Sequence, residues 1–217
     1  MTEPARPSKP LGGRVDRRNA FSTPIRGCEI RMDMMHSLDI TVTQLVNGLA
    51  ESSPFLDAIM IWISAAGIPM LVIAVACQWW AKTDRQSTRH VLVGAGLAFF
   101  LGLAFNQIIL LFVDRVRPYV TGVTDLLIAP SLDPSFPSDH STAAFAIAMT
   151  FAVNSMPRRA LWFGMAALVV AFSRVYIGTH YAIDVLGGAL TGAFAAAIVQ
   201  SLYIRGTRLD RIITGIF

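Results

Sequence analysis

Charged residues are scarce in this 217-residue chain: Asp, Glu, Lys and Arg make up only 15%, against 54% apolar residues. A water-soluble domain of this size needs more surface charge, so the composition excludes an ordinary soluble protein and indicates that the bilayer is the solvent. The net charge is +4, but the basic residues lie in short clusters between apolar stretches. This pattern is typical of membrane orientation signals, and we expect no nucleic-acid partner.

Cysteine is also rare, since only Cys28 and Cys77 occur. One lies in a polar region and the other in an apolar run, so they provide neither a disulfide framework nor a metal site. We expect two free thiols. The first apolar run comes too late for a secretory signal pattern, and we expect none.

Long apolar runs, in contrast, are frequent after residue 58. About 20 apolar residues are needed to cross a bilayer as a helix. Two segments reach this length without a charge (59–80 and 91–113), and three more reach it with one polar end (138–156, 160–178 and 181–204). The sequence therefore predicts an all-α, polytopic membrane helical bundle with about five transmembrane helices.

The N-terminal part differs from this bundle. Apolar residues at 38, 42, 45, 46 and 49 recur at helical spacing among polar ones, which predicts an amphipathic helix lying in the membrane interface. Residues 1–33 are rich in Pro, Gly and Arg without periodicity, and we expect a disordered tail there. The membrane domain would then comprise residues 34–211.

The polar ends of the five predicted spans differ in charge. One side collects eight basic residues: Lys82, Arg85, Arg89, Arg158, Arg159, Arg205, Arg208 and Arg211. The positive-inside rule makes that side cytoplasmic and the other side the outer face. The Arg-rich tail would then lie outside, against the same rule. A natural start at Met32, Met34 or Met35 would remove this conflict, and N-terminal sequencing of the native protein tests that hypothesis.

Three polar clusters meet at the predicted outer face: residues 114–118, residues 135–141, and Ser173-Arg174 followed by His180 and Asp184. Ionisable groups near hydrocarbon are costly unless they are paired or solvated, so their clustering suggests a shared task. Taken singly, Arg115 could be a headgroup anchor and His140 an interfacial residue. The joint arrangement is what indicates a site.

The residue types of these clusters suit phosphate chemistry. Ser138 would open a helix, where its hydroxyl and free N–H groups can bind an anion, and Arg117 and Arg174 offer planar forks for phosphate oxygens. His180 and Asp184 are four residues apart and share a helix face, so the carboxylate can hold one ring nitrogen while the other attacks. His140 could protonate the leaving oxygen.

Metal-dependent and transport functions are the rival interpretations. A zinc site would need an HExxH pattern or a cysteine pair, and arginines would repel the metal. We therefore expect no metal and no cofactor, with charge stabilisation supplying the catalysis. An anion transporter remains a remote alternative, although transporters usually carry midplane polar residues and broken helices.

The three clusters resemble the motifs of the type-2 phosphatidic acid phosphatase family, which shares its site with vanadium haloperoxidases. The third motif is complete as Ser173-Arg174, His180 and Asp184; the second reads Pro137-Ser138-Asp139-His140, with Asp where the family usually has Gly. The first keeps Arg117-Pro118, but Leu110 stands at the usual lysine position. Together the motifs span about 75 residues in the family order.

The resemblance implies a role for each matching residue. His180 would form a phosphohistidine, Asp184 would orient it, and His140 would act as the general acid. Arg117, Arg174 and Ser138 would hold the phosphoryl oxygens, with Asp139 and Ser173 as supporting residues. Arg115 could replace the missing lysine as a phosphate ligand.

Within that family, Ser-Phe-Pro-Ser-Asp-His is most similar to the bacterial undecaprenyl-diphosphatase branch. Asn106, Gln107, Asp133 and the Arg-x-Arg-Pro form also fit that branch. The resemblance implies a bacterial inner-membrane enzyme that hydrolyses undecaprenyl diphosphate at the outer, periplasmic face, with a polyprenyl lipid in the bilayer as its partner. Alternatives are a phosphatase or phosphotransferase of phosphatidic acid, phosphatidylglycerophosphate or lipid A. The sequence leaves the oligomeric state open.

Overall fold

The computed structural model describes residues 26–82 and 84–215. The chain divides into two units, Met1–His36 and Ser37–Phe217. The described part of the first unit is helical and belongs to the beginning of α1. The described residues contain helices and no strand: α1 (Arg26–Asn47), α2 (Pro54–Cys77), the 3₁₀ helix η2 (Gln78–Trp80), α3 (Arg85–Leu110), α4 (Asp139–Val153), α5 (Pro157–Tyr176), α6 (Ala182–Leu202) and α7 (Arg208–Thr214).

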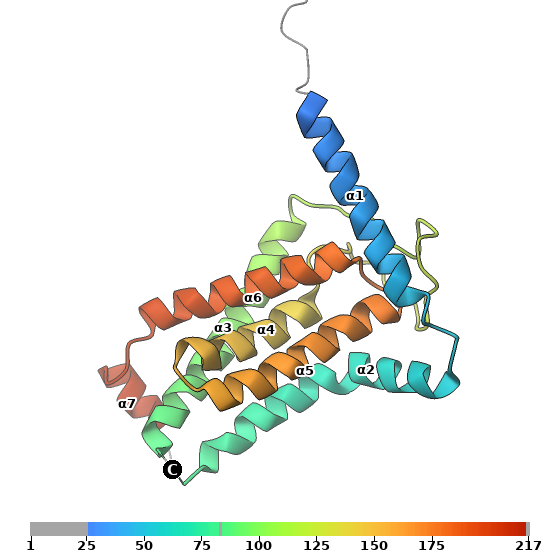
Figure 1. Cartoon of the computed structure of the whole chain (residues 1–217). Helices are drawn as coiled ribbons and strands as arrows, with labels where there is room; N and C mark the ends of the chain where they lie inside the picture. The colour runs from blue at the N-terminus through green and yellow to red at the C-terminus, as the bar shows by residue number, and fades with distance from the viewer. Residues whose placement is uncertain (1–25, 83, 216–217) are drawn as a thin grey trace, which may run out of the picture. The chain divides into compact units, whose positions relative to one another are not determined.

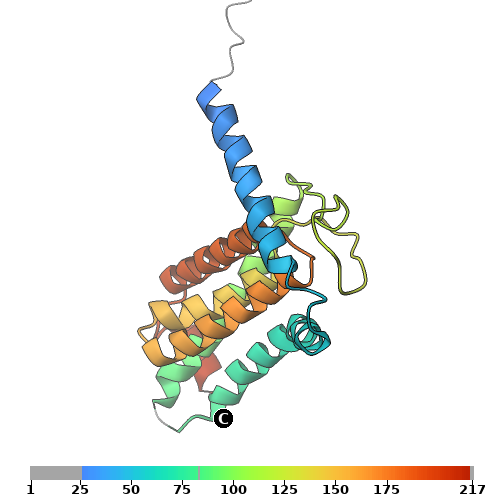
Figure 2. The same ribbon diagram turned by 45° about the vertical axis from the view of Figure 1, so that its right-hand side comes forward.

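Helices α3 to α6 run up and down beside one another, with α4 in contact with α3, α5 and α6 (Figures 1 and 2). The end of α3, the beginning of α4, the end of α5 and the beginning of α6 meet at one end of this bundle, which we call the site end. The other end carries η2, the α4–α5 turn and α7, and we call it the basic end. The long connection 111–138 lies at the site end.

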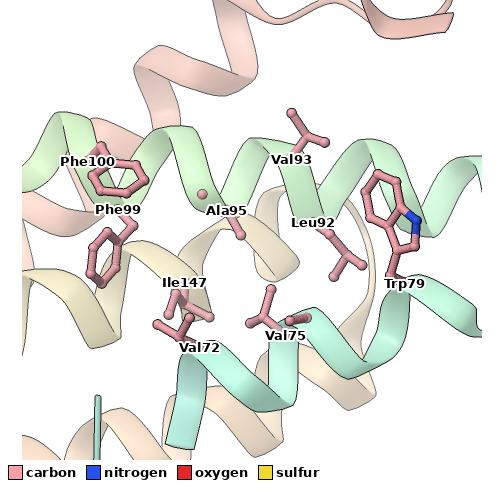
Figure 3. Close-up of a pocket in the computed structure, with 11 residues that line it drawn as sticks. Val72, Val75, Trp79, Leu92, Val93, Ala95, Phe99, Phe100 and Ile147 are labelled. Atoms are coloured by element: carbon pink, nitrogen blue, oxygen red, sulfur yellow. The ribbon is translucent and has the colours of Figure 1, made fainter. Parts of the chain in front are cut away.

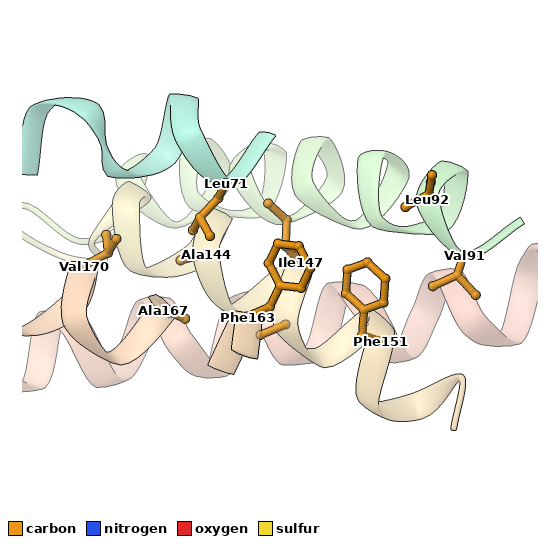
Figure 4. Close-up of a cluster of buried hydrophobic side chains, with 10 residues drawn as sticks. Leu71, Val91, Leu92, Ala144, Ile147, Phe151, Phe163, Ala167 and Val170 are labelled. Carbon is orange, nitrogen blue, oxygen red and sulfur yellow. The ribbon is translucent and has the colours of Figure 1, made fainter. Parts of the chain in front are cut away.

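The apolar core lies where α4 faces α2, α3 and α5 (Figure 4). Phe151 of α4 stacks on Phe163 of α5 with ring centroids 4.7 Å apart. Ala144 and Ile147 of α4 and Ala167 of α5 are buried in the same cluster. Small and large apolar side chains interdigitate here, which fixes the rotation of α4 and with it the direction of its first turn.

Two glycines bring α6 close to α4. A Cβ atom on Gly188 would lie 2.4 Å from the carbonyl oxygen of Ser138, and one on Gly192 would lie 2.3 Å from that of Thr142. Small residues allow such close backbone approach between membrane helices. The beginning of α6 is therefore held directly against the beginning of α4, and both helices contribute to the site end.

The outward surface of the bundle is apolar. Large hydrophobic side chains such as Trp62, Phe100, Leu168, Leu190 and Phe194 are more than half exposed. Four helical segments are long and apolar enough to cross a membrane: Pro54–Trp80, Arg85–Leu110, Pro157–Tyr176 and Ala182–Leu202. These observations confirm a multi-pass, all-helical membrane protein.

The third of the five predicted spans is shorter than expected. The sequence predicted it over residues 138–156, but α4 has only 15 residues. At 1.5 Å per residue it is about 22 Å long, against roughly 30 Å for the hydrocarbon core. Nine of its residues are buried, so α4 is surrounded by other helices.

The predicted amphipathic segment around residues 38–49 is largely part of a longer helix. It belongs to α1, which begins at Arg26, before the expected boundary near residue 33; residues 1–25 lie outside the described residues. Between Ser37 and Asn47 the polar side of α1 is buried, since Asp39 and Thr43 are 3% and 0% exposed, whereas Leu45 is 75% exposed. Over these residues the polar side of α1 faces the bundle, because Asp39 and Thr43 accept hydrogen bonds from backbone N–H groups at the beginning of α6. The location of this helix in the membrane interface stays a prediction.

The basic end is held together by the carboxylate of Asp210 on α7. It accepts hydrogen bonds from the Tyr203 hydroxyl (2.7 Å) and the Gly206 backbone (2.7 Å), and its Oδ1 lies 2.8 Å from Nδ1 of His90 on α3. Helix α7 thus extends the folded part to Thr214, slightly beyond the predicted boundary at 211. Cys77 is a free and exposed thiol, as predicted.

Candidate active site

The site end encloses a cavity of about 310 Å³. The connection 111–138 and the ends of α3, α4, α5 and the α5–α6 loop all contribute to its wall. The lining residues are Gln107, Leu110, Arg117, Ser131, Asp133, Pro134, Pro137, Asp139, His140, Arg174 and His180. The cavity therefore brings together four candidate residues that the sequence places in separate clusters: His140, His180, Arg117 and Arg174.

His180 occupies the loop between α5 and α6 and is almost completely buried. Its Nδ1 lies 2.8 Å from the carbonyl oxygen of Ser135. A carbonyl oxygen can only accept a hydrogen bond, so Nδ1 carries the proton of the neutral ring. Nε2 then keeps its lone pair, which is the state that a nitrogen nucleophile requires.

The sequence suggested that Asp184 holds a ring nitrogen of His180 directly, but the structure shows no direct hydrogen bond between them. Its Oδ2 is 3.8 Å from Nδ1 of His180, which is beyond hydrogen-bonding distance. The same oxygen accepts the hydroxyl of Ser135 and, at 2.8 Å, the backbone N–H of Tyr181. Asp184 thus fixes Ser135, and the carbonyl of Ser135 fixes the imidazole. This role of Ser135 was not predictable from the sequence, because a backbone carbonyl leaves no signature in the residue type.

The electrostatic surroundings favour the neutral form of His180. Burial lowers the pKa of this histidine, and the positive charges of Arg174 and Arg117 lower it further, while Asp184 acts in the opposite direction. The net shift of the pKa is downward. This shift favours the uncharged ring, which is the form that a nitrogen nucleophile requires.

The two arginines of the cavity are held in place by hydrogen bonds to the surrounding protein. Arg117 donates from Nε to the carbonyl of Asp133 (2.7 Å) and from Nη1 to that of Thr179 (3.0 Å). Arg174, in the last turn of α5, donates from Nη1 to the hydroxyl of Ser64 on α2. Both guanidinium groups are thus fixed in the wall of the cavity, where their other donors can meet an oxyanion.

Unpaired polar atoms cluster around this cavity. Among the described residues, three buried side-chain atoms have no hydrogen-bond partner: Nε of Arg174, Oγ of Ser138 and Oδ1 of Asn106. Each such atom typically costs about 1–3 kcal/mol. Arg174 lines the cavity, Ser138 directly precedes Asp139 and His140, and Asn106 bonds to Asp139. Their position indicates that a polar ligand completes the site.

His140 and Asp139 form the first turn of α4. His140 lines the cavity, and its ring interacts with the backbone of Ser64. Asp139 accepts a 2.6 Å hydrogen bond from Nδ2 of Asn106 on α3, so its carboxylate is held by an amide. Ser138 is the fully buried N-cap residue, and its backbone N–H donates to the Asp184 carbonyl at 3.0 Å.

Arg115 does not take the place of the missing lysine. Its Nη1 bonds to Asp184, its Nη2 bonds to Asp39 of α1, and its guanidinium lies 4.0 Å from the ring centroid of Tyr181. Although burial alone would lower it, the two carboxylates raise the pKa of Arg115. The side chain is absent from the cavity wall, because its donors are committed to these carboxylates.

Asp39 is a second residue whose part in the site has no signal in the sequence. Its Oδ1 accepts the backbone N–H of Ile183 at 2.9 Å, while Oδ2 holds Arg115. The position of the missing lysine is taken by Leu110, and the neighbouring polar group in the wall is the amide of Gln107, one turn earlier on α3. Ser173 is fully buried outside the cavity, and its hydroxyl bonds to the Val170 carbonyl at 2.7 Å; it does not support the site directly.

Comparison with known proteins places this geometry in a family. Residues 91–207 match the model of the PAP2 superfamily. Undecaprenyl-diphosphatase BcrC of Bacillus subtilis is 34% identical over 80% of this chain and 86% of its own length. Lipid A 1-phosphatase of Rhizobium johnstonii is 35% identical over 85% of this chain and 74% of its own length.

A solved structure supports the fold independently. The transmembrane PAP2-type phosphatidylglycerolphosphate phosphatase from Bacillus subtilis aligns with a TM-score of 0.62 at 23% identity, covering 85% of this chain and 93% of that one. The family match includes the beginning of α4, the end of α5 and the α5–α6 loop, which carry both cavity histidines. The chain belongs to the PAP2 superfamily and is a lipid phosphate phosphatase.

Proposed function

We propose that this protein hydrolyses undecaprenyl diphosphate to undecaprenyl phosphate and inorganic phosphate at the outer face of a bacterial plasma membrane. The observation that carries the proposal is the cavity itself. The neutral His180, with Nε2 free, shares this cavity with the fixed guanidinium groups of Arg117 and Arg174. Nε of Arg174 has no hydrogen-bond partner. The similarity to BcrC supports this substrate among lipid phosphates.

The first step is attack of Nε2 of His180 on the terminal phosphorus. The bond from this phosphorus to the bridging oxygen breaks as the N–P bond forms, and undecaprenyl phosphate leaves with the electron pair. His140, in its protonated form, donates a proton to the leaving oxygen. Arg117 and Arg174 stabilise the charge on the equatorial oxygens of the transferring group.

The second step returns the enzyme to its starting state. His140, now neutral, removes a proton from a water molecule that attacks the phosphorus of the phosphohistidine. The N–P bond breaks, inorganic phosphate is released, and Nε2 of His180 regains its lone pair. The carbonyl of Ser135 keeps the imidazole in one orientation through both steps, so little reorganisation is needed.

The proposed orientation follows from helix direction and charge. We infer that α4 also crosses the bilayer, because it begins at the site end and finishes at the basic end, as its connections to α3 and α5 require. The chain then crosses the bilayer five times, through α2 to α6, and the site end and the basic end lie on opposite sides of the membrane. The basic residues of the η2–α3, α4–α5 and α6–α7 connections favour a cytoplasmic basic end and an outer site end.

The substrate is tested with purified protein in detergent that contains EDTA. Undecaprenyl diphosphate, phosphatidic acid, phosphatidylglycerophosphate and lipid A are compared side by side for phosphate release. The proposal expects the highest kcat/KM with undecaprenyl diphosphate and no activity in His180→Ala. A preference for another lipid phosphate would overturn the substrate, and loss of activity with EDTA would overturn the metal-independent mechanism.

The orientation is tested separately with single cysteines in a variant that lacks Cys28 and Cys77. Leu132→Cys lies at the site end on a fully exposed side chain, and Arg158→Cys is its exposed counterpart at the basic end. A membrane-impermeant maleimide applied to intact spheroplasts should label only the first. Labelling of only Arg158→Cys would reverse the proposed orientation.

A further inference from the structure

An apolar groove lies between α2 and α3, outside the cavity described above (Figure 3). Its volume is about 260 Å³. Val72, Val75 and Trp79 line it from the α2 side, and Leu92, Gly96 and Phe100 line it from α3. Ile147 of α4 forms the floor. A groove lined almost entirely by apolar side chains suits a hydrocarbon chain.

The groove and the catalytic cavity share the same faces of the same helices. On α4, Ile147 follows His140 by seven residues, which is close to two turns, so both side chains project toward the same side. On α3, Phe100 and Gly96 precede Gln107 by seven and eleven residues, again on one face. Along both helices the groove therefore begins about 10 Å from the cavity, in the direction of the basic end.

The space between α2 and α3 opens toward the lipid. Helix α2 packs mainly on α5 and makes little contact with α3 within the described residues. It bends along its length (Figure 1), and Pro69, which cannot donate a helical hydrogen bond, lies inside it. At the far end η2 packs on α3 and closes the space beside Trp79. The groove is thus closed at the basic end, where η2 packs on α3.

We propose that this groove binds the isoprenoid chain of the substrate whose diphosphate occupies the cavity; this inference rests on the proposed function. One helix on each side and one helix as floor leave room for a single chain. From Gln107 to Leu92 the path along α3 is about 22 Å. A long polyprenyl chain fills this path, whereas a farnesyl chain ends near its upper part.

Gly96 provides a direct test, because a Cβ atom added there would meet no atom within 4 Å. The side chain of Gly96→Leu therefore begins in open space on the wall of the groove, and leucine favours the helix over glycine. Gly164 on α5 is a matched control: it is also helical and half-buried, its added Cβ would meet nothing within 4 Å, and it lines neither the groove nor the cavity. Gly164→Leu makes the same chemical change elsewhere.

The measurement is KM and kcat for undecaprenyl diphosphate and farnesyl diphosphate with both variants in detergent. We expect Gly96→Leu to raise KM for the long substrate by about tenfold, as loss of apolar burial predicts. KM for farnesyl diphosphate and both kcat values should change little, and Gly164→Leu should behave as the wild type. Val72→Phe narrows the groove from the α2 side and should reproduce the result if Gly96→Leu is poorly folded.

Equal effects on the two chain lengths, or equal effects of the two glycine substitutions, would overturn the groove assignment and leave bilayer lipid as its occupant. A wild-type protein that hydrolyses neither diphosphate would instead overturn the proposed function. The two failures are therefore distinguishable.

Discussion

Nδ1 of His180 lies 2.8 Å from the carbonyl oxygen of Ser135, closer than the 3.8 Å that separates it from the carboxylate of Asp184. The partner that sets the tautomer of His180 is thus the backbone carbonyl of Ser135. The carboxylate of Asp184 acts indirectly, through its hydrogen bond to the Ser135 hydroxyl. In familiar nucleophile–base–orienter arrangements the acidic side chain contacts the ring itself. Here the acid orients a serine, and the serine orients the ring.

Ser135→Ala tests this indirect contact. The substitution removes the hydroxyl that bonds to Asp184 but leaves the carbonyl that holds His180. Loss of one buried hydrogen bond is worth about 1–2 kcal/mol, so kcat should fall by roughly tenfold. KM should stay within about twofold, because Ser135 does not line the cavity. Thr, which keeps a hydroxyl, should restore part of kcat; an unchanged kcat in Ser135→Ala would contradict the proposed role.

Arg115→Gln should affect stability far more than phosphate binding. The change leaves Asp39 and Asp184 without their shared cation. Because Arg115 is partly exposed, we expect a loss of about 2 kcal/mol, below the range for a fully buried pair. Thermal unfolding in detergent should show a lower Tm, while KM of the folded fraction stays near the wild-type value. Arg117→Gln is the contrasting variant and should raise KM strongly; a similar rise in Arg115→Gln would restore the phosphate-ligand hypothesis.

The pH profile should reflect the lowered pKa of His180. Only the neutral ring can attack, and it is the dominant form above its pKa. Burial, together with Arg174 and Arg117, lowers that pKa, so kcat/KM should remain high as the pH falls through about 6.5, the ordinary histidine value. The acid limb attributable to His180 should lie below this value. Arg117→Gln removes one positive charge and should move the limb to higher pH; movement in the other direction would contradict the assignment.

His140→Asn should separate the two chemical steps. A lipid phosphate is a comparatively good leaving group, so the first step tolerates loss of the general acid better than the second tolerates loss of the base that activates water. Undecaprenyl diphosphate labelled in its terminal phosphate should then leave acid-labile label on the protein. The double variant His140→Asn/His180→Ala is the control and should remain unlabelled. Labelling that persists in the double variant would place the covalent group elsewhere.

Much of this architecture was predictable from local sequence patterns. Apolar runs of helical length identified the bundle, and the spacing of the motif residues led us to expect that His140, His180, Arg117 and Arg174 meet. They do line one cavity. These features were accessible because each depends on residue type and on short-range periodicity.

The remaining features depend on long-range packing. The Arg115–Asp39 contact joins residues 76 positions apart, and the sequence near either residue does not indicate its partner. The length of α4 was overestimated because the predicted span continued to Met156, whereas the helix stops at Val153 and Ser155 takes a left-handed backbone conformation (φ 56°). The burial of Asp39 and Thr43 was also inaccessible, since a pattern of alternating polarity in α1 identifies two faces but does not say which of them meets protein.

The burial of the polar side of α1 against the bundle has a consequence for sequence variation among relatives. Its outward positions, including Leu38, Val42 and Leu45, need only remain apolar, and they should drift freely among hydrophobic residues. Asp39 is different, because its carboxylate serves Arg115 and the backbone of Ile183 together. A relative that replaces the arginine should also replace this aspartate, so the two positions are expected to covary even though one lies in α1 and the other just after α3.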